Sequence, residues 1–162
     1  MGESVWRNII NVEEKSYKSL LNSEDNFLSL NVAGQSSVQS SMNDFFKPVE
    51  LKGDEKYYHE ESDSYVDATK LIKVIETPHI LFLHFKDRHL LHFDRKKEQV
   101  VSKRNDQAIK LDEYIRIPVY NKDELEAEPR YLQYKRVAVV LRHSFGMDNG
   151  HYTCGIWTKS QS

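Results

Sequence analysis

The sequence predicts an α+β fold that is mostly β, with one helix and about seven strands. Residues 26–32 place Leu28, Leu30 and Val32 on alternate positions, which is typical of a half-buried strand. Residues 37–47 instead carry apolar side chains three and four positions apart, as on one face of a helix. The rest of the chain consists mainly of short apolar runs separated by turn residues.

The first third of the chain predicts two strands and the helix. Residues 3–12 contain four spaced aliphatic side chains and predict a strand, whereas residues 13–25 are polar and predict a loop or hairpin tip. Ser36 or Ser37 is expected to cap the helix. Pro48 should end it, because the residue before a proline avoids the α region.

The middle of the chain alternates between charged and apolar segments. Residues 50–64 are acidic and predict a solvated loop. Residues 66–75 predict a strand, and residues 79–85 predict a second one that is central and covered on both faces, because the run is almost fully apolar. We expect His84, inside this run, to be a hydrogen-bonded histidine of the sheet.

Weaker patterns follow. Residues 88–101 alternate only partly, residues 105–106 indicate a turn, and residues 108–117 form a short apolar run that ends at Pro118. Residues 121–130 are charged and predict a loop.

The last segment, residues 134–157, predicts a β-hairpin. An apolar run and a strand-like run flank a turn-rich loop that contains two glycines. His143 and His151 then lie near the inner ends of the two strands. An imidazole can bind or release a proton near neutral pH, so these histidines are either catalytic or structural hydrogen-bonding groups, and the pattern leaves both readings open.

Composition limits the classes of function. The 162 residues suit one domain or part of a larger one, and 39% hydrophobic content allows a core. A net charge of −2 provides no basic field for nucleic acid or a membrane, and no apolar run approaches the roughly 20 residues of a membrane span. The single cysteine, Cys154, excludes an internal disulfide and suits a reducing, intracellular compartment.

The segment VVLRHSFGMDNGHYTCGIW resembles the closing motif of the ubiquitin-specific proteases, a papain-like family of cysteine peptidases. That motif is an apolar strand, His-Ser-Gly, a short loop and Gly-His-Tyr. The matching residues here are His143, Ser144, Gly150, His151 and Tyr152. Phe145 departs from the pattern, since the family prefers glycine at that position.

Other segments resemble the same family in the same order. They are EDNFLSLNV, SSVQSSMNDFFKPVELKGDEKYY, ATKLIKVIETPHILFLHFKDR and LDEYI. Together they extend from about residue 5 to residue 157. The chain is identified as similar to zinc-less members such as the herpesvirus-associated ubiquitin-specific protease.

The resemblance implies an antiparallel β-rich palm and fingers with few helices and the thumb missing. Residues 1–75 would form fingers-like strands and one helix, and residues 76–162 the palm. The catalytic cysteine would lie before residue 1, and the third member of the triad beyond Trp157.

The resemblance also implies a function, namely a portion of a deubiquitinating cysteine peptidase that hydrolyses the bond after the ubiquitin C-terminal glycine. His151 would be the general base, and His143, Phe145, Gly150 and Tyr152 would contact the substrate. Cys154 cannot be the nucleophile of His151, because residues 151 and 154 face opposite sides of a strand. We expect Cys154 to be buried and this chain alone to be inactive.

We expect no cofactor and no metal site. The family's Cys-x-x-Cys pairs have no counterpart here, and His59, Glu60 and Asp63 make an incomplete ligand set.

The expected partner is ubiquitin, with self-association through the surface left by the missing thumb as an additional expectation. The acidic side chains Asp123, Glu124, Glu126 and Glu128 would either steer ubiquitin or form an ordinary solvated loop. Two other readings stay open. One is a catalytically inactive ubiquitin-binding or scaffolding module, and the other is a β-rich interaction domain with a coincidental likeness.

Overall fold

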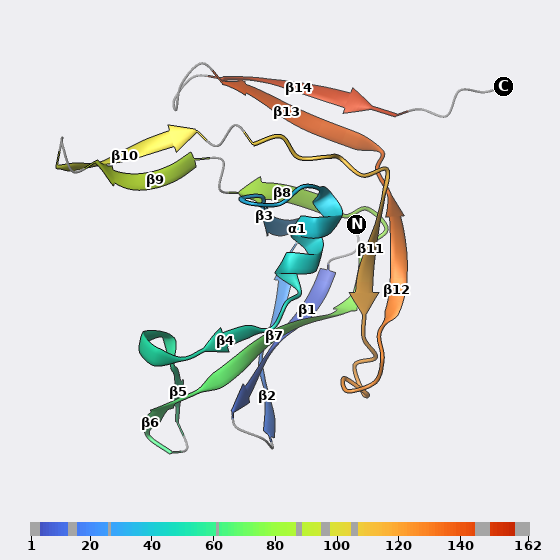
Figure 1. Ribbon diagram of the computed structural model, residues 1–162. Coiled ribbons are helices and arrows are strands. Elements are labelled where there is room, and N and C mark those ends of the chain that lie inside the picture. Colours follow the sequence, from blue (N-terminus) through green and yellow to red (C-terminus); the bar gives the residue numbers. More distant parts are fainter. Residues whose placement is uncertain are drawn as a thin grey trace.

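The computed structural model describes residues 4–12, 16–25, 27–60, 62–86, 89–94, 98–104, 107–144 and 150–157. Within them, fourteen strands surround one α-helix (Figure 1). The elements are β1 (Ser4–Val12), β2 (Ser16–Asp25), β3 (Phe27–Asn31), α1 (Val38–Phe45), β4 (Val49–Leu51), the 3₁₀ turn η1 (Gly53–Glu55), β5 (Tyr57–His59), β6 (Ser64–Val66), β7 (Ala68–Glu76), β8 (Phe82–Lys86), β9 (His89–Asp94), β10 (Gln99–Arg104), β11 (Tyr114–Val119), β12 (Arg130–Lys135), β13 (Ala138–Ser144) and β14 (Gly150–Ile156).

The main sheet has six strands in the order β12-β11-β7-β1-β2, with β4 paired to β7. Four two-stranded ribbons complete the fold, namely β3–β8, β5–β6, β9–β10 and β13–β14. Most pairs are antiparallel, as predicted. The exceptions are β3 with β8 and a single parallel pair between Val74 of β7 and Val119 of β11.

The core lies where α1 packs against β3 and β11. Its buried side chains are Leu28, Leu30, Val38, Met42, Val74, Ile115, Ile117 and Val119. The predicted stripe of α1 therefore faces the core, and the alternation in residues 26–32 places its three aliphatic side chains in the interior. Both predictions are confirmed. No helix in the described part of the chain is long and apolar enough to cross a bilayer.

The ends of α1 follow local chemistry. The Ser37 hydroxyl accepts a hydrogen bond from Ser40 N at 3.1 Å, and Ser40 Oγ accepts one from Ser37 N at 3.0 Å, so Ser37 is the N-cap of a reciprocal capping box. The helix ends at Phe45, before Pro48 but two residues earlier than the end at residue 47 that the sequence predicted.

Asp112 ties the first turn of α1 to the segment before β11. Its carboxylate accepts a hydrogen bond from Gln39 N at 2.9 Å, near the positive end of the helix dipole. Burial alone would raise the pKa of Asp112, but hydrogen bonds from Gln39 and Ser37 and the nearby Lys110 ammonium outweigh burial and lower the pKa.

Three predictions about strands are wrong. Residues 16–25 form β2 instead of a loop, because antiparallel pairing with β1 satisfies the backbone whatever the polarity of the side chains. The run at residues 79–85 is not a covered central strand. It enters β8 only at Phe82, β8 pairs only with β3 among the described residues, and Phe82 is 58% exposed. The third error is the number of strands, which is twice the seven expected.

The acidic segment at residues 50–64 is mostly exposed, as predicted, although it also contributes to the short strands β4, β5 and β6. His84 is a hydrogen-bonded histidine of the sheet, as expected, because its Nδ1 lies 3.1 Å from Ser29 Oγ on the neighbouring strand.

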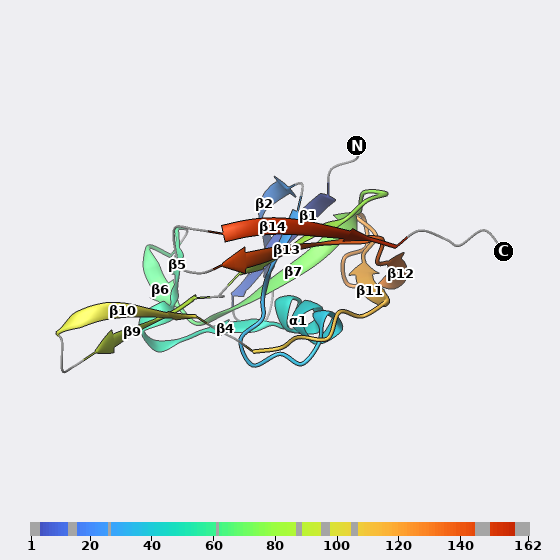
Figure 2. The same ribbon diagram turned by 90° about the horizontal axis from the view of Figure 1, so that it is seen from above.

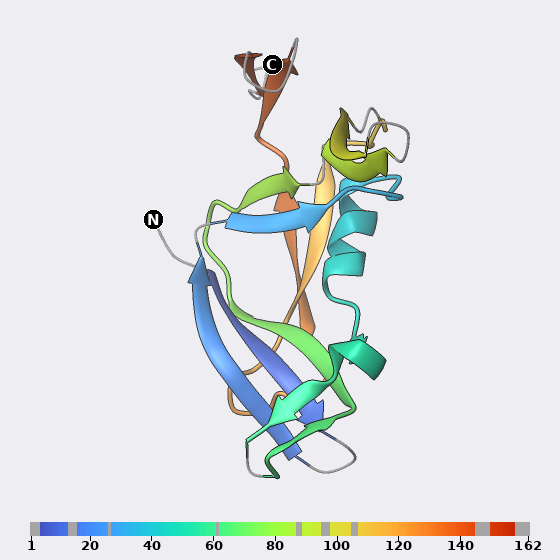
Figure 3. The same ribbon diagram turned by 90° about the vertical axis from the view of Figure 1, so that its left-hand side faces the viewer.

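Two regions stand apart from the packed centre. The short strands β4, β5 and β6 lie at one end of the molecule, and the β13–β14 hairpin lies at the other, beyond β3 and β8 (Figures 1 and 3). Seen from above, the hairpin extends over the body of the molecule (Figure 2).

Candidate functional site

The β13–β14 hairpin brings the two candidate histidines together. The strands pair antiparallel from Ala138 opposite Ile156 to Ser144 opposite Gly150, and this register places His143 directly opposite His151. Directly opposite residues on one face of a ribbon have Cβ atoms roughly 5 Å apart. The predicted hairpin with a histidine near each inner end is therefore confirmed.

One hydrogen bond orients the first of these rings. His143 Nε2 lies 2.8 Å from Thr153 Oγ1, so the imidazole leans along the ribbon toward the residue two positions after His151. His143, His151 and Thr153 thus share one face of the hairpin, since alternate residues of a strand face the same side. Sequence reasoning missed Thr153, although the two-residue period from His151 could have identified it.

Gly150 lies in a crowded position at the start of β14. A Cβ at this position would lie 3.0 Å from Arg142 Nε and 3.1 Å from the His143 carbonyl oxygen. Real Cβ contacts are rarely this short, so a side chain here would push on the backbone that carries His143. The glycine before His151 therefore lets β13 approach β14 closely.

Of the other two predicted substrate contacts, the structure describes Tyr152 but not Phe145. Tyr152 lies opposite Arg142 on the face turned away from His151, and its side chain is 63% exposed. Phe145 lies outside the described residues, so its predicted role has no structural description.

The expectation that Cys154 is buried is wrong. The thiol belongs to an exposed residue opposite Val140, because no described element covers either face of β14. The register does place Cys154 and His151 on opposite faces of the strand, as the sequence period requires. An imidazole and a thiol on opposite faces cannot form a nucleophile–base pair with each other.

Arg136 joins the hairpin to the rest of the protein. Its guanidinium carbon lies 4.2 Å from the centroid of the Trp157 ring, and its Nη1 donates to the Leu111 carbonyl oxygen. The backbone adds a bond from Arg136 N to Glu113 O at 2.8 Å and one from Trp157 N to Val137 O at 2.9 Å. The base of the hairpin is therefore held by a cation–π contact and hydrogen bonds.

The acidic side chains that were considered for steering are remote from this site. Asp123, Glu124, Glu126 and Glu128 are exposed in the connection between β11 and β12. That connection lies at the opposite end of these strands from the hairpin (Figure 1). Their position favours the reading of an ordinary solvated loop.

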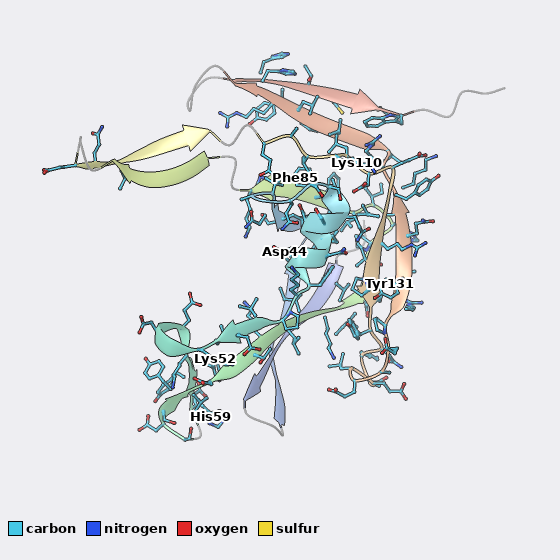
Figure 4. All side chains as sticks on the ribbon, in the orientation of Figure 1. Asp44, Lys52, His59, Phe85, Lys110 and Tyr131 are labelled. Atoms are coloured by element: carbon cyan, nitrogen blue, oxygen red, sulfur yellow. The ribbon has the colours of Figure 1, made fainter. Side chains whose placement is uncertain are left out.

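Two of the three residues expected to make an incomplete metal site, His59 and Asp63, make other contacts. His59 Nδ1 lies 2.8 Å from Ser62 Oγ, and Asp63 accepts a hydrogen bond from the Tyr58 hydroxyl, which raises the pKa of Tyr58. His59 is labelled in Figure 4, on β5 at the end of the molecule far from the hairpin. Among the described residues, no group of three or more His, Cys, Asp and Glu side chains could hold a metal ion.

The site on the hairpin offers an accessible imidazole and little else for chemistry. His151 is exposed, and strands β13 and β14 contain no carboxylate. The arrangement can accept a proton from a nucleophile presented on the histidine face, whereas a complete nucleophile–base–carboxylate set is absent from these two strands.

Comparison with known proteins identifies the family. The family profile of ubiquitin carboxyl-terminal hydrolase matches residues 2–162. Ubiquitin carboxyl-terminal hydrolase 26 of Arabidopsis thaliana is 28% identical over 129 residues, which cover 80% of this chain and 11% of the relative. Ubiquitin carboxyl-terminal hydrolase 25 of the same plant is 25% identical over 126 residues, which cover 77% of this chain and 17% of the relative. The chain thus spans less than a fifth of either relative.

Solved structures show the same fold. The SAGA Ubp8/Sgf11/Sus1/Sgf73 DUB module bound to ubiquitin aldehyde superposes with a TM-score of 0.75 at 20% identity, covering 97% of this chain and 34% of that chain. A yeast SAGA DUB module with an Sgf73 mutant superposes with a TM-score of 0.69 at 19% identity, covering 94% of this chain and 32% of that chain. At these identities the likeness concerns the fold.

These findings exclude a coincidental likeness. They leave the closer similarity to the herpesvirus-associated member untested, so that statement stays a prediction. The chain belongs to the ubiquitin carboxyl-terminal hydrolase family and has the palm and fingers fold of ubiquitin-specific proteases.

Proposed function

We propose that this chain is part of a deubiquitinating cysteine peptidase that hydrolyses the bond after the ubiquitin C-terminal glycine, with His151 as its general base. The observation that carries the proposal is an exposed His151 directly after Gly150, on a face shared with His143. A general base must be accessible to its nucleophile, and His151 is an exposed residue. His143, Phe145, Gly150 and Tyr152 are the proposed substrate contacts.

The nucleophile in this proposal comes from outside the 162 residues. Cys154, the single cysteine, faces away from His151. The proposed partner is ubiquitin, as in the DUB module bound to ubiquitin aldehyde. We propose an intracellular setting, since an exposed free thiol suits a reducing compartment.

A thiol-reactive ubiquitin probe tests the enzyme proposal. We expect a longer chain containing these residues to be labelled, and His151→Ala to reduce the labelling rate by about 10²-fold or more. Tyr65→Ala, at an exposed residue of β6, is the control and should label normally. Labelling of the 162-residue chain at Cys154 would contradict the proposal, as would full labelling of the longer His151→Ala protein.

A catalytically inactive ubiquitin-binding or scaffolding module is the second candidate. The separation of Cys154 from His151 favours it. This candidate requires ubiquitin binding by the 162-residue chain in titration calorimetry together with no labelling of the longer chain. Labelling of the longer chain would exclude it.

We also propose the self-association expected through the surface left by the missing thumb, and the exposed apolar side chains of the hairpin support it. Val140, Tyr152 and Ile156 are each more than 60% exposed on one face of the ribbon. Exposed apolar patches favour association. Sedimentation should show a mass that rises with concentration, and Val140→Ser with Ile156→Ser should abolish the rise. A constant monomer mass would oppose this proposal.

We propose the division into fingers at about residues 1–75 and palm at about 76–162. The strand pairs β1–β2 and β5–β6 before residue 76, and the pairs β9–β10 and β13–β14 after it, support the division. The two parts are joined in the core, because β3 of the first part pairs with β8 of the second part. Cleavage near residue 76 should therefore leave two parts that stay associated, as size-exclusion chromatography under native conditions can measure.

A further inference from the structure

An open groove of about 560 Å³ runs along α1 and the outer face of β11 and β12. Alternation explains its floor, because Ile115, Ile117 and Val119 point into the core while the residues between them point outward. One wall comes from α1 residues at helical spacing. The lining residues are Gln39, Asn43, Phe46, Tyr114, Arg116, Pro118, Tyr120, Tyr131 and Gln133. Figure 4 labels Tyr131, which lies on β12.

The lining combines aromatic rings with one positive charge. Four of the nine residues are aromatic, three carry amides, and the only charged one is Arg116. Across the described part of the chain, the Arg116 guanidinium makes no ion pair and no hydrogen bond, and the residue is exposed. Within the described residues, the groove therefore presents an unpaired cation in a lining that contains four aromatic side chains and no carboxylate.

The backbone that carries Arg116 is held by the helix wall of the groove. Arg116 N donates to Gln39 Oε1 at 2.7 Å, and Gln39 Nε2 donates to the Arg116 carbonyl oxygen at 3.2 Å and to Asn43 Oδ1 at 2.9 Å. The backbone of Gln39 is in turn held by Asp112. The wall and the floor are thus joined before any ligand arrives, which reduces the entropy lost on binding.

The charged side chains near the two ends of the groove have neighbours that interact with them, unlike Arg116 at its centre. At one end, Lys135 lies 3.5 Å from Glu113 and 5.6 Å from the Tyr114 ring centroid, so its charge is already partly compensated. At the other end, burial raises the pKa of Tyr120, and Tyr131 and the carboxylate of Glu128 add to that rise. Among the nine lining residues, the positive charge is therefore that of Arg116, between Tyr114 and Tyr120 along β11, while the Lys73 ammonium lies 4.8 Å from the Tyr120 ring centroid.

We propose that this groove binds an acidic segment of a partner protein, with one carboxylate on Arg116 and a neighbouring aromatic or aliphatic side chain against Tyr114 and Tyr131. A guanidinium binds a carboxylate through two parallel hydrogen bonds. Tyrosines supply apolar contact area with a polar tip, and Arg and Tyr are the residues that most often dominate binding energy. The volume suits a few residues of a peptide.

The test uses the 162-residue chain and the fluorescein-labelled peptide Asp-Glu-Phe-Asp-Glu-Leu. Fluorescence anisotropy measures the affinity, and amide shifts in a ¹⁵N spectrum identify the surface that binds. We expect the shifts to gather on β11, β12 and α1, and the affinity to fall as salt rises. The peptide Lys-Lys-Phe-Lys-Lys-Leu should bind at least tenfold more weakly.

Variants separate the charge from the rings. Arg116→Gln should weaken binding of the acidic peptide at least tenfold and remove most of the salt dependence, while Tyr131→Ser should weaken it by about threefold to tenfold. Lys86→Gln is the matched control, because Lys86 is an exposed cation on β8 outside the groove. Thermal unfolding of each variant shows that the fold is retained.

Two kinds of result would overturn the proposal. One is the absence of shifts in the groove at millimolar peptide, or equal affinity of Arg116→Gln and wild type. The other is a different occupant, seen as groove shifts that depend on the concentration of the protein alone or that appear with ubiquitin but not with the acidic peptide. None of these results bears on labelling through His151, so this test is independent of the proposed enzymatic function.

Discussion

The centre of the molecule and the β13–β14 hairpin have similar apolar sequences and opposite environments. Leu30, Met42 and Ile117 are fully buried where α1 packs against β3 and β11. Val140 and Ile156, which belong to equally strand-like runs, are 65% and 71% exposed. Burial of an aliphatic side chain contributes about 1.5–3 kcal/mol, so the same residue type stabilises the centre and contributes little in the hairpin.

The centre of the chain buries its apolar side chains within its own fold, whereas the hairpin leaves the apolar side chains of its two strands exposed. In the centre, a helix closes the apolar face of the strands, and capping and Asp112 fix the position of that helix. In the hairpin, the described contacts to the body are concentrated at its base, around Arg136. The four predictions below test this difference, from the largest expected effect to the smallest.

Removing a core side chain should have the largest effect. Ile117→Ala leaves a cavity between α1 and β11 and should lower the free energy of unfolding by about 2–5 kcal/mol. Ile156→Ala deletes the same atoms from an exposed site and should change it by less than about 0.5 kcal/mol. Urea unfolding followed by circular dichroism measures both. Similar losses in the two variants would mean that the hairpin is covered in solution.

Asp112 should make the stability of the centre depend on pH. Its folded-state pKa lies below its ordinary value of about 3.9, so the carboxylate stabilises the fold above that pH, and the stabilisation is lost as pH falls through the folded pKa. Asp112→Asn should lower the free energy of unfolding at pH 7 by about 1–2 kcal/mol. The difference from wild type should shrink below about pH 4.

Denaturant unfolding between pH 3 and pH 7 measures this difference. Asp54→Asn, at an exposed carboxylate of η1, is the control and should change stability by less than about 0.5 kcal/mol. A difference between Asp112→Asn and wild type that stayed constant down to pH 3 would show that the charge of Asp112 is not what holds the helix.

The helix cap should contribute less. Ser37→Ala removes the acceptor for Ser40 N and should cost about 1 kcal/mol. Ser36→Ala, one residue earlier, keeps its backbone N–H bond to Ser40 Oγ and should be nearly neutral. Thermal unfolding distinguishes the two. Equal losses would be evidence against the assignment of Ser37 as the N-cap.

The smallest effect on global stability should come from Gly150→Ala. The added Cβ would press on Arg142 and the His143 carbonyl, so we expect amide shifts confined to β13 and β14 with little change in unfolding. Gly155→Ala is the matched control, since its Cβ would meet Val139 Cγ1 at an ordinary 3.6 Å. Shifts of equal size in the two variants would refute the crowding at Gly150.

Local chemistry accounts for the elements that were predicted correctly. The serines before α1, the proline after it and the alternation in residues 26–32 each act through neighbouring residues, and so they are visible in the sequence. The hairpin and the pairing of His143 with His151 follow from two strand-like runs around a turn. The family resemblance added the expected role of His151.

The errors arise where strand pairing or packing, and not the polarity of the side chains, decides the structure. β2 exists because β1 pairs with it, and the polarity of its sequence concealed that pairing. The apolar run before and within β8 suggested cover on two faces, yet Ile80 and Phe82 are mostly exposed. Cys154 has the polarity of a core residue, and its exposure depends on what packs over β14.

By itself the sequence determined the helix, several strands and the position of the final hairpin with His143 and His151 near its inner ends. Propensity, capping and two-residue alternation act over a few residues, so they can be read without coordinates. Only the tertiary structure decided which apolar faces are covered, how β3 and β8 run parallel, and that Arg116, without an ion pair among the described residues, lies in a groove between segments far apart in the chain. These features depend on contacts between segments distant in sequence, which no local pattern encodes.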